Sequence, residues 1–292
     1  MKTKKYILIL AILCLAVVQS SAQKDETKKY EFGINGFYGL SGLSGSVNNG
    51  SITSGLGYKL SIDGEYFFAS HIGLGIGTCY ATYTSKADLN SYTSNAPAID
   101  DEGGSFEYRV KASGIKEKLN LTAIEVPVFI AYRKVLSRKI RLQSHVGLKA
   151  SIPIEATYQC TNGVTETKGY YISNNVEFAN MPNHGFQTID RINYSGNLST
   201  TIAYSIFGNV GITIPMGVIG LNLGVYGSYG LNSILKPRSS FLIDYPDNYN
   251  SLSSLSGKVS LISGGIRVGI NFPCRSAKIK AARIKTSHGG KR

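Results

Sequence analysis

Eight stretches of this 292-residue chain alternate apolar and polar side chains with a period of two, and no other feature constrains the fold as strongly. In residues 58–68, for example, tyrosine, leucine, isoleucine and phenylalanine occupy most even positions, while lysine, serine and acidic residues occupy most odd ones. A period of two is typical of β-strands with two unlike faces, and no convincing helical period interrupts the pattern. The predicted strands are 30–41, 58–68, 72–83, 119–132, 140–154, 198–214, 219–231 and 259–272.

The connections between these strands alternate in length. The three short ones lie at Ser70, 136–139 and 215–218. The four long ones are 42–56, 84–118, 155–197 and 232–258. Outer-membrane barrels have short turns on one side of the membrane and long loops on the other, whereas compact soluble domains rarely contain loops of about 30–40 residues. The sequence therefore predicts an all-β fold, an eight-stranded antiparallel up-and-down transmembrane β-barrel with long extracellular loops and short periplasmic turns.

The polar faces of the predicted strands determine what would fill such a barrel. Eight strands enclose only enough space for side chains, and in a membrane barrel the polar face points inward. Four acidic and four basic residues occupy these faces: Glu31, Asp63, Glu65, Glu125, Lys59, Arg141, Lys149 and Arg267. Ions in a narrow lumen of low dielectric constant must be paired, because an isolated one costs several kcal/mol. The balanced set predicts a plugged lumen with a charge network, since a selective channel would favour one sign.

Both ends of the chain carry separate signals. Residues 1–22 combine lysines, an apolar run too short to span a membrane, and Ser-Ser-Ala, which together predict a signal peptide before the barrel domain 23–272. Residues 273–292 hold seven basic and no acidic residues. This segment is predicted to be a basic periplasmic tail that engages anionic lipid or cell-wall polymer, or else a solvated extension. Because the tail and signal hold most of the net charge of +13, no nucleic acid is expected as a partner.

No arrangement of residues indicates catalysis, a cofactor or a metal. The histidines His71, His145, His184 and His288 are dispersed and lack the spacing of metal or catalytic motifs. We expect His145 to be a hydrogen-bonded lumen residue and the acidic run 100–102 to be solvated. We therefore expect no catalytic, cofactor-binding or metal-binding residues, and a protein that is not an enzyme.

Tyrosines and cysteines give two further expectations. Tyrosines near the predicted strand ends are expected to form aromatic girdles at the membrane interfaces. They are Tyr30, Tyr58, Tyr83, Tyr132, Tyr204 and Tyr229. Three cysteines remain after the signal, and their odd number and separation predict free thiols. They are Cys79, Cys160 and Cys274.

The segment 124–132, with the sequence IEVPVFIAY, carries a family motif. In PorT-like outer-membrane β-barrel domains a Leu/Ile-Glu-hydrophobic-Pro-hydrophobic strand is followed by an aromatic residue, and Glu125, Pro127 and Tyr132 occupy these positions. The chain resembles this family over about residues 30–272 and is broadly similar to OmpA-type transmembrane domains. The resemblance implies an integral outer-membrane protein of a Gram-negative cell envelope and permits a part in protein export. The twenty residues after Phe272 depart from the usual aromatic end of such barrels.

Several functions remain open on the sequence alone. A structural or interaction component would contact outer-membrane lipid, and other envelope proteins through loops 84–118 and 155–197. A lipid-modifying barrel enzyme would require a Ser, His and acid cluster, which these positions do not assemble. A small pore would require an open lumen, and a soluble lipocalin-like barrel would place its apolar faces inward. We expect the structural or interaction role.

Overall fold

The computed structural model describes residues 30–137, 139–236 and 241–274. The predicted signal peptide 1–22 and residues 275–292 of the predicted tail therefore lie outside the described residues. The described part is built almost entirely of antiparallel β-strands, which confirms the predicted all-β barrel class. No helix in this part of the chain is both long and apolar enough to cross a membrane.

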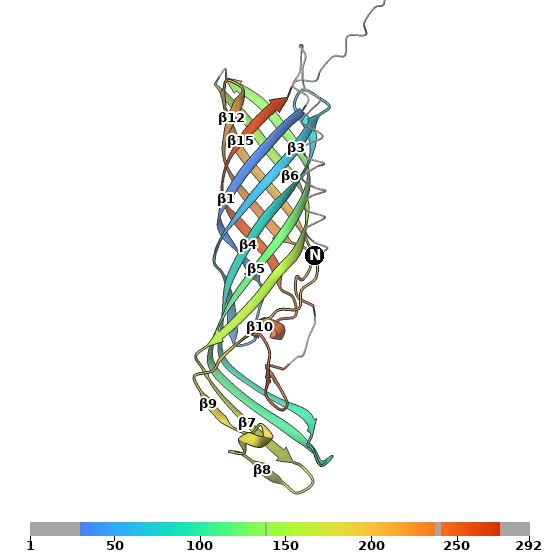
Figure 1. Ribbon diagram of the computed structural model, residues 1–292, viewed down its shortest axis with the longest axis vertical. Helices are drawn as coiled ribbons and strands as arrows, with labels where there is room; N and C mark the ends of the chain where they lie inside the picture. Colours follow the sequence, from blue (N-terminus) through green and yellow to red (C-terminus); the bar gives the residue numbers. More distant parts are fainter. Residues whose placement is uncertain (1–29, 138, 237–240, 275–292) are drawn as a thin grey trace, which may run out of the picture.

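Eight strands pair into a closed ring. Each pairs with its neighbours in antiparallel orientation, and the pairing of β5 with β6 completes the ring. In ring order the strands are β1 (Tyr30–Ser44), β3 (Leu56–Phe67), β4 (Ile72–Ile99), β5 (Ser105–Ser137), β6 (Ile140–Thr161), β11 (Ala203–Met216), β12 (Ile219–Gly230) and β15 (Ser260–Cys274). Figure 1 shows the ring as a tall cylinder with an extension at the end opposite the short turns.

The complete sheet contains 13 strands, so the predicted count of eight describes the ring and not the whole sheet. The additional strands arise from stretches predicted as loops, because β2, β7 and β10 pair with the protruding parts of ring strands and β8 and β9 pair with β7. They are β2 (Gly50–Ser54), β7 (Val164–Tyr171), β8 (Val176–Phe178), β9 (Thr188–Asp190) and β10 (Asn193–Asn197). A separate small sheet joins β13 (Ile243–Asp244) to β14 (Asn248–Tyr249), and two 3-10 helices are η1 (Pro182–His184) and η2 (Leu252–Leu255).

The prediction of a loop at 84–118 is wrong. Strands β4 and β5 continue through most of this stretch as one hairpin, paired from Ser85↔Leu119 out to Ile99↔Ser105. β7 adds to the other edge of β5, so the distal parts of β4 and β5 form an extracellular sheet together with β7, β8 and β9. The distal part of β5 does alternate, because residues 106–112 read FEYRVKA with the apolar side chains buried. The facing part of β4 does not show the pattern, since Ser91–Ile99 carries mostly small or polar residues on both faces.

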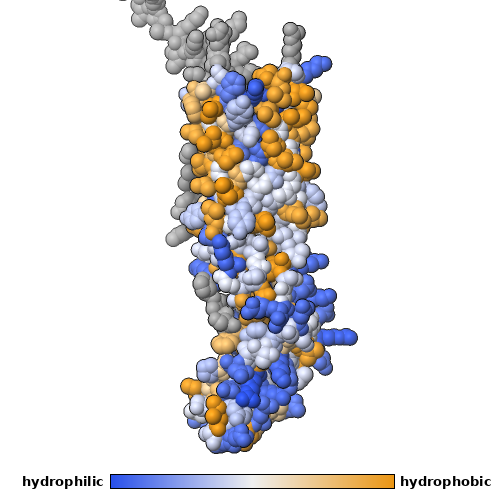
Figure 2. All heavy atoms as spheres, turned by 180° about the vertical axis from the view of Figure 1, so that it is seen from behind, coloured by the Kyte–Doolittle hydropathy of each residue, from blue (hydrophilic) through white to orange (hydrophobic). Residues whose placement is uncertain are grey.

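The apolar face of the ring points outward. Val126, Leu223 and Ile266 are 36%, 40% and 55% exposed, whereas Asp63 and Arg267 are 8% and 5% exposed. Figure 2 shows hydrophobic side chains gathered over the barrel end and hydrophilic ones over the loop-bearing end. An apolar band of this extent belongs in hydrocarbon. The inverted, soluble arrangement is thereby excluded.

Two residues of the motif strand point inward and require local adjustments. The Phe129 ring packs against His145 at a centroid distance of 4.6 Å. It fits because Gly75 has no Cβ to collide with the ring, and Gly147 has none to collide with the Val128 carbonyl oxygen and the Phe129 Cα. Pro127 is also buried. The ladder between β4 and β5 is interrupted at Gly77 and Thr78, opposite Pro127 and Val126, and Pro127 has no N–H to donate to it. These adjustments let a bulky ring and a proline lie within a closed barrel.

Candidate functional site

The eight charged residues predicted for the lumen all lie inside the ring. Seven of them are buried, and the side chain of Arg141 is 15% exposed. They come from β1, β3, β5, β6 and β15, and they form three hydrogen-bonded groups along the lumen instead of a single cluster. We name these the Glu125 group, the Arg267 group and the Glu31 group.

In the Glu125 group, one carboxylate serves two ammonium groups. Lys149 Nζ lies 2.8 Å from both oxygens of Glu125, and Lys59 Nζ lies 3.6 Å from Oε2. Tyr83 donates its hydroxyl to the same carboxylate, and Ser151 Oγ donates at 3.1 Å. Tyr83 is 1% exposed, so its predicted place in an interfacial girdle is wrong. Its position in β4 gives it the inward parity, and the lysines and carboxylate supply partners for its hydroxyl.

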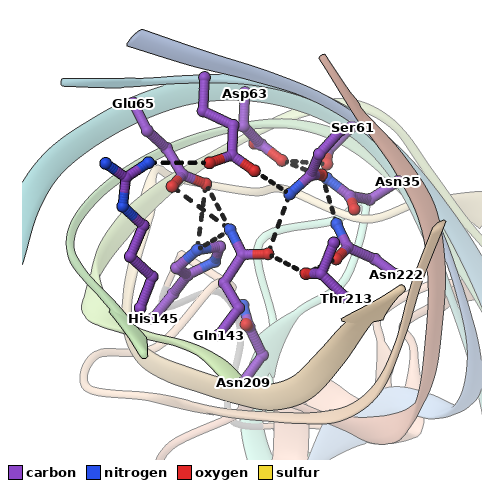
Figure 3. Close-up of polar contacts among 12 residues, drawn as sticks. Asn35, Ser61, Asp63, Glu65, Gln143, His145, Asn209, Thr213 and Asn222 are labelled. Carbon is purple, nitrogen blue, oxygen red and sulfur yellow. Dashed lines mark hydrogen bonds and ion pairs between the residues drawn. The ribbon is translucent and has the colours of Figure 1, made fainter. Parts of the chain in front are cut away.

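The Arg267 group joins a guanidinium to a carboxylate through an amide. Arg267 donates from Nε to Asn35 Oδ1 at 3.0 Å and from Nη1 to Asn209 Oδ1 at 2.7 Å. Asn35 in turn donates to Asp63 Oδ2 at 2.7 Å. Arg267 Nη1 also lies 3.3 Å from His145 Nδ1, so His145 is a hydrogen-bonded lumen residue. Figure 3 shows Asn35, Asp63, His145 and Asn209 pointing into the same space.

The Glu31 group lies at the end of the barrel that bears the short turns. Glu31 pairs with Arg141, and Arg133 Nη1 lies 3.3 Å from its other oxygen. Asn271 Nδ2 donates to Glu31 at 2.7 Å and to Gln143 Oε1 at 2.9 Å. Two guanidinium groups therefore share one carboxylate here, as two ammonium groups share Glu125.

Gln143 links the Glu31 group to the middle of the lumen. Its Nε2 donates to Glu65 at 3.2 Å, and its Oε1 accepts a hydrogen bond from Thr213 Oγ1 at 3.1 Å. His145 Nε2 lies 3.0 Å from Glu65 Oε1. Figure 3 shows Gln143 among Glu65, His145 and Thr213. The polar network is thus continuous from the Glu31 group through Gln143 and His145 to the Arg267 group, as expected for buried ions that must be satisfied.

Sequence reasoning missed several members of the network. Tyr83, Arg133, Gln143 and Asn271 were not predicted as charge-network residues, because three are uncharged and Arg133 lies near a strand end. For Arg133, Gln143 and Asn271 the available signal was inward parity on the same strands as Glu125, Arg141 and Arg267, whereas Tyr83 lies on β4, which contributes none of the predicted charges. The rest of the motif does not enter the network: Tyr132 is 38% exposed and its ring lies 6.2 Å from that of His71.

A loop covers the extracellular end of the lumen. Residues 241–259 between β12 and β15, named here the plug loop, bury Leu242, Ile243 and Leu252 completely. Glu117 of β5 holds this loop, because its carboxylate accepts from Ser251 Oγ at 2.7 Å and from the Leu252 backbone N at 2.8 Å. Burial raises the pKa of the Glu117 carboxyl, which lies beyond the lipid-facing band. The lumen is therefore closed by an apolar cover above a charged filling.

The extracellular sheet packs against the same plug loop. Tyr108 Oη donates to the carbonyl oxygens of Gly185 and Pro246, at 3.2 and 3.1 Å. The rings of Phe106 and Tyr245 meet edge to face with centroids 5.1 Å apart. The connections predicted as independent loops are thus joined into one packed extracellular unit.

Little space remains in the lumen. A cavity of about 50 Å³ lies among residues of the Glu125 and Arg267 groups, enough for a few water molecules. Its charged lining residues are Lys59, Asp63, Glu125, Lys149 and Arg267. No group of three or more His, Cys, Asp or Glu residues within the described ranges is arranged to hold a metal ion. The cysteines Cys79, Cys160 and Cys274 are free thiols.

The closed ring, its exposed apolar band and its ion-filled lumen define a membrane β-barrel. The family model described as outer membrane protein beta-barrel domain matches residues 21–236. The chain belongs to this family, and its location is the cell outer membrane.

Solved outer-membrane proteins resemble the chain at low sequence identity. Neisserial surface protein A is 8% identical, with 86% of this chain and 99% of that chain covered and a TM-score of 0.36. OprG from Pseudomonas aeruginosa is 12% identical, with coverages of 84% and 95% and a TM-score of 0.35. Ail of Yersinia pestis, solved with the heparin analogue sucrose octasulfate, is 8% identical, with coverages of 84% and 99% and a TM-score of 0.32. No curated protein matches the chain.

Proposed function

We propose that this protein is a closed outer-membrane barrel that acts as a structural or interaction component, without enzymatic activity. The proposal rests on one observation: the lumen is filled by paired ions and covered by the plug loop, while a packed sheet reaches beyond the barrel on the extracellular side. A filled lumen provides neither a pore through which solutes could pass nor a cavity that a substrate could enter. Its partners are then outer-membrane lipid around the band and other envelope proteins at the extracellular sheet.

Two finer assignments belong to the same proposal. We propose that the barrel is PorT-like and is associated with protein export, on the strength of Glu125, Pro127 and Tyr132 in the motif strand. Glu125 lies between two lysines, and its carboxylate is required to neutralise them. This requirement explains why the motif contains a glutamate at this position. We also propose that the basic segment 275–292 engages anionic lipid or cell-wall polymer, on the strength of its charge.

Planar-bilayer recording tests the closed barrel. The protein without residues 1–22, refolded in detergent and checked for the change in gel mobility on boiling that folded barrels show, is expected to give no stable conductance. The same preparation is expected to leave phospholipid and lipid A unchanged. A steady open conductance would establish the small pore instead, and turnover of either lipid would establish the barrel enzyme.

A further inference from the structure

The distal part of β4 has a free edge. Ser91–Ile99 pair with β5 on one side. On the other side, β3 pairs with β4 only as far as Ala81, β2 only as far as Leu89, and Asn90 N donates to Asn49 O at 2.9 Å. No strand of the described residues pairs with Ser91–Ile99 on that side. We call these nine residues the open edge, and they extend for roughly 30 Å at about 3.4 Å per residue.

The open edge is held in place by packing on one face. Tyr92 and Ala98 pack against the buried cluster that contains Phe106, Tyr108 and the plug loop. Leu242 N donates to Tyr92 Oη at 3.2 Å. An edge that is already fixed in an extended conformation loses little conformational entropy when a ligand binds.

The open edge lacks the usual protection against pairing. No charged residue lies between Asp88 and Asp100. Natural sheets protect exposed edges with lysines, bulges, prolines or covering loops, and the single device here is Pro97 near the far end. The other exposed-face residues are the small or polar Ser91, Thr93 and Asn95, which leave room for a strand at the normal spacing of about 4.8 Å, and Ile99 at the tip. A long edge with Pro97 as its single protective device favours pairing with another chain.

We propose that the open edge binds an extended segment of another polypeptide by strand addition to β4. As far as Pro97, which has no N–H, the unpaired side presents N–H and C=O groups from every second residue, repeating at about 6.8 Å. The partner that matches this repeat is a polypeptide backbone in extended conformation. Because the open edge carries no charged side chain, it does not select partners by their charge, and hydrogen bonds between the two backbones supply the affinity. This inference deepens the proposed interaction role and rests on it.

The test uses the folded protein in detergent and a fluorescent synthetic peptide. The peptide has the sequence of Ser105–Ser113, the segment of β5 that pairs antiparallel with the opposite side of the open edge residues. Fluorescence anisotropy is expected to show saturable binding. A second peptide, N-methylated at alternate residues on its pairing edge, is expected to bind at least about tenfold more weakly, because it cannot complete the ladder.

Variants locate the binding. Thr93→Lys combined with Asn95→Lys places two charges on the open edge and is expected to weaken binding about tenfold or more. The control Ser113→Lys lies on the same face directly opposite Ser91, but on β5, which is paired on both sides, and it is expected to change affinity less than about twofold. The change in gel mobility on boiling confirms that each variant is folded.

The outcomes separate this inference from the proposed function. Equal binding of both peptides, or equal loss of affinity in the edge variant and the Ser113→Lys control, would overturn strand addition at this edge. The proposal of a closed barrel would still hold if the bilayer recordings show no conductance. A dimer of the protein that disappears in the edge variant would identify a second copy as the occupant and overturn binding of another polypeptide.

Discussion

At the scale of single residues, the lumen balances its charges by sharing carboxylates. Glu125 serves two lysines and Glu31 serves two arginines. The period-two alternation predicted which charged residues point inward, because parity alone decides that. It could not predict that Arg267 reaches Asp63 through Asn35, since that contact depends on the register in which β15, β1 and β3 pair and on side-chain rotamers.

Removing the central carboxylate is expected to destabilise the barrel strongly. Glu125→Gln leaves two buried ammonium groups without an anion, and breaking a buried pair in this way costs about 3–5 kcal/mol. Urea unfolding in detergent, followed by circular dichroism because the chain has no tryptophan, measures this loss. The matched control Glu166→Gln removes a surface partner of Lys168 and should cost less than about 1 kcal/mol. Equal losses in the two variants would contradict the role assigned to Glu125.

At the scale of elements, strands and their order follow from the sequence, but their lengths do not. The lipid-facing halves of β4 and β5 carry large apolar residues at every second position. The extracellular half of β5 still alternates, with large apolar residues packed inward and charged residues on the other face. The extracellular half of β4 carries mostly small and polar residues, and its inner face is decided by packing against the plug loop, more than a hundred residues away.

The plug loop is expected to loosen as pH rises. Burial raises the pKa of Glu117 in the closed state, so the stabilisation of closure is fully present below the pKa of the exposed carboxyl, about 4.3, and is lost as pH rises through the raised value. The groups that face this carboxylate are Ser251, Cys160 and the Leu252 backbone N. Glu117→Gln has no such ionisation.

Hydrogen–deuterium exchange of plug-loop amides measures this effect. The wild-type protein is compared at each pH with Glu117→Gln, which corrects for the intrinsic pH dependence of exchange. Protection in wild type relative to the variant should fall as pH increases from 4 to 8. A ratio that stays constant over this range would show that ionisation of Glu117 does not control the loop.

At the scale of the whole molecule, the protein has two surfaces of different chemistry along the same strands. Exposed apolar residues on the ring strands form the band, which Figure 2 shows on one face. Beyond it the strands continue as the extracellular sheet (Figure 1). The sequence predicted the first surface from composition and alternation. It did not predict that the second would be an ordered sheet.

A matched pair of substitutions on β4 is expected to separate the two surfaces. Ile76 and Ile99 are similarly exposed, at 59% and 66%, but only Ile76 lies in the band. Ile76→Arg should destabilise the barrel in lipid vesicles by about 2–4 kcal/mol, depending on depth, because a charge then faces hydrocarbon. Ile99→Arg should fold with the wild-type yield, as measured by gel mobility without boiling. Similar folding of both variants would show that Ile76 does not face lipid.

The uninterrupted course of β4 and β5 from the short turns to the extracellular tip has a mechanical consequence. A pulling force applied at the tip is directed along these strands and loads their inter-strand hydrogen bonds in shear, so that many must break together. Force reaching the tip is therefore transmitted along the hairpin to the embedded cylinder.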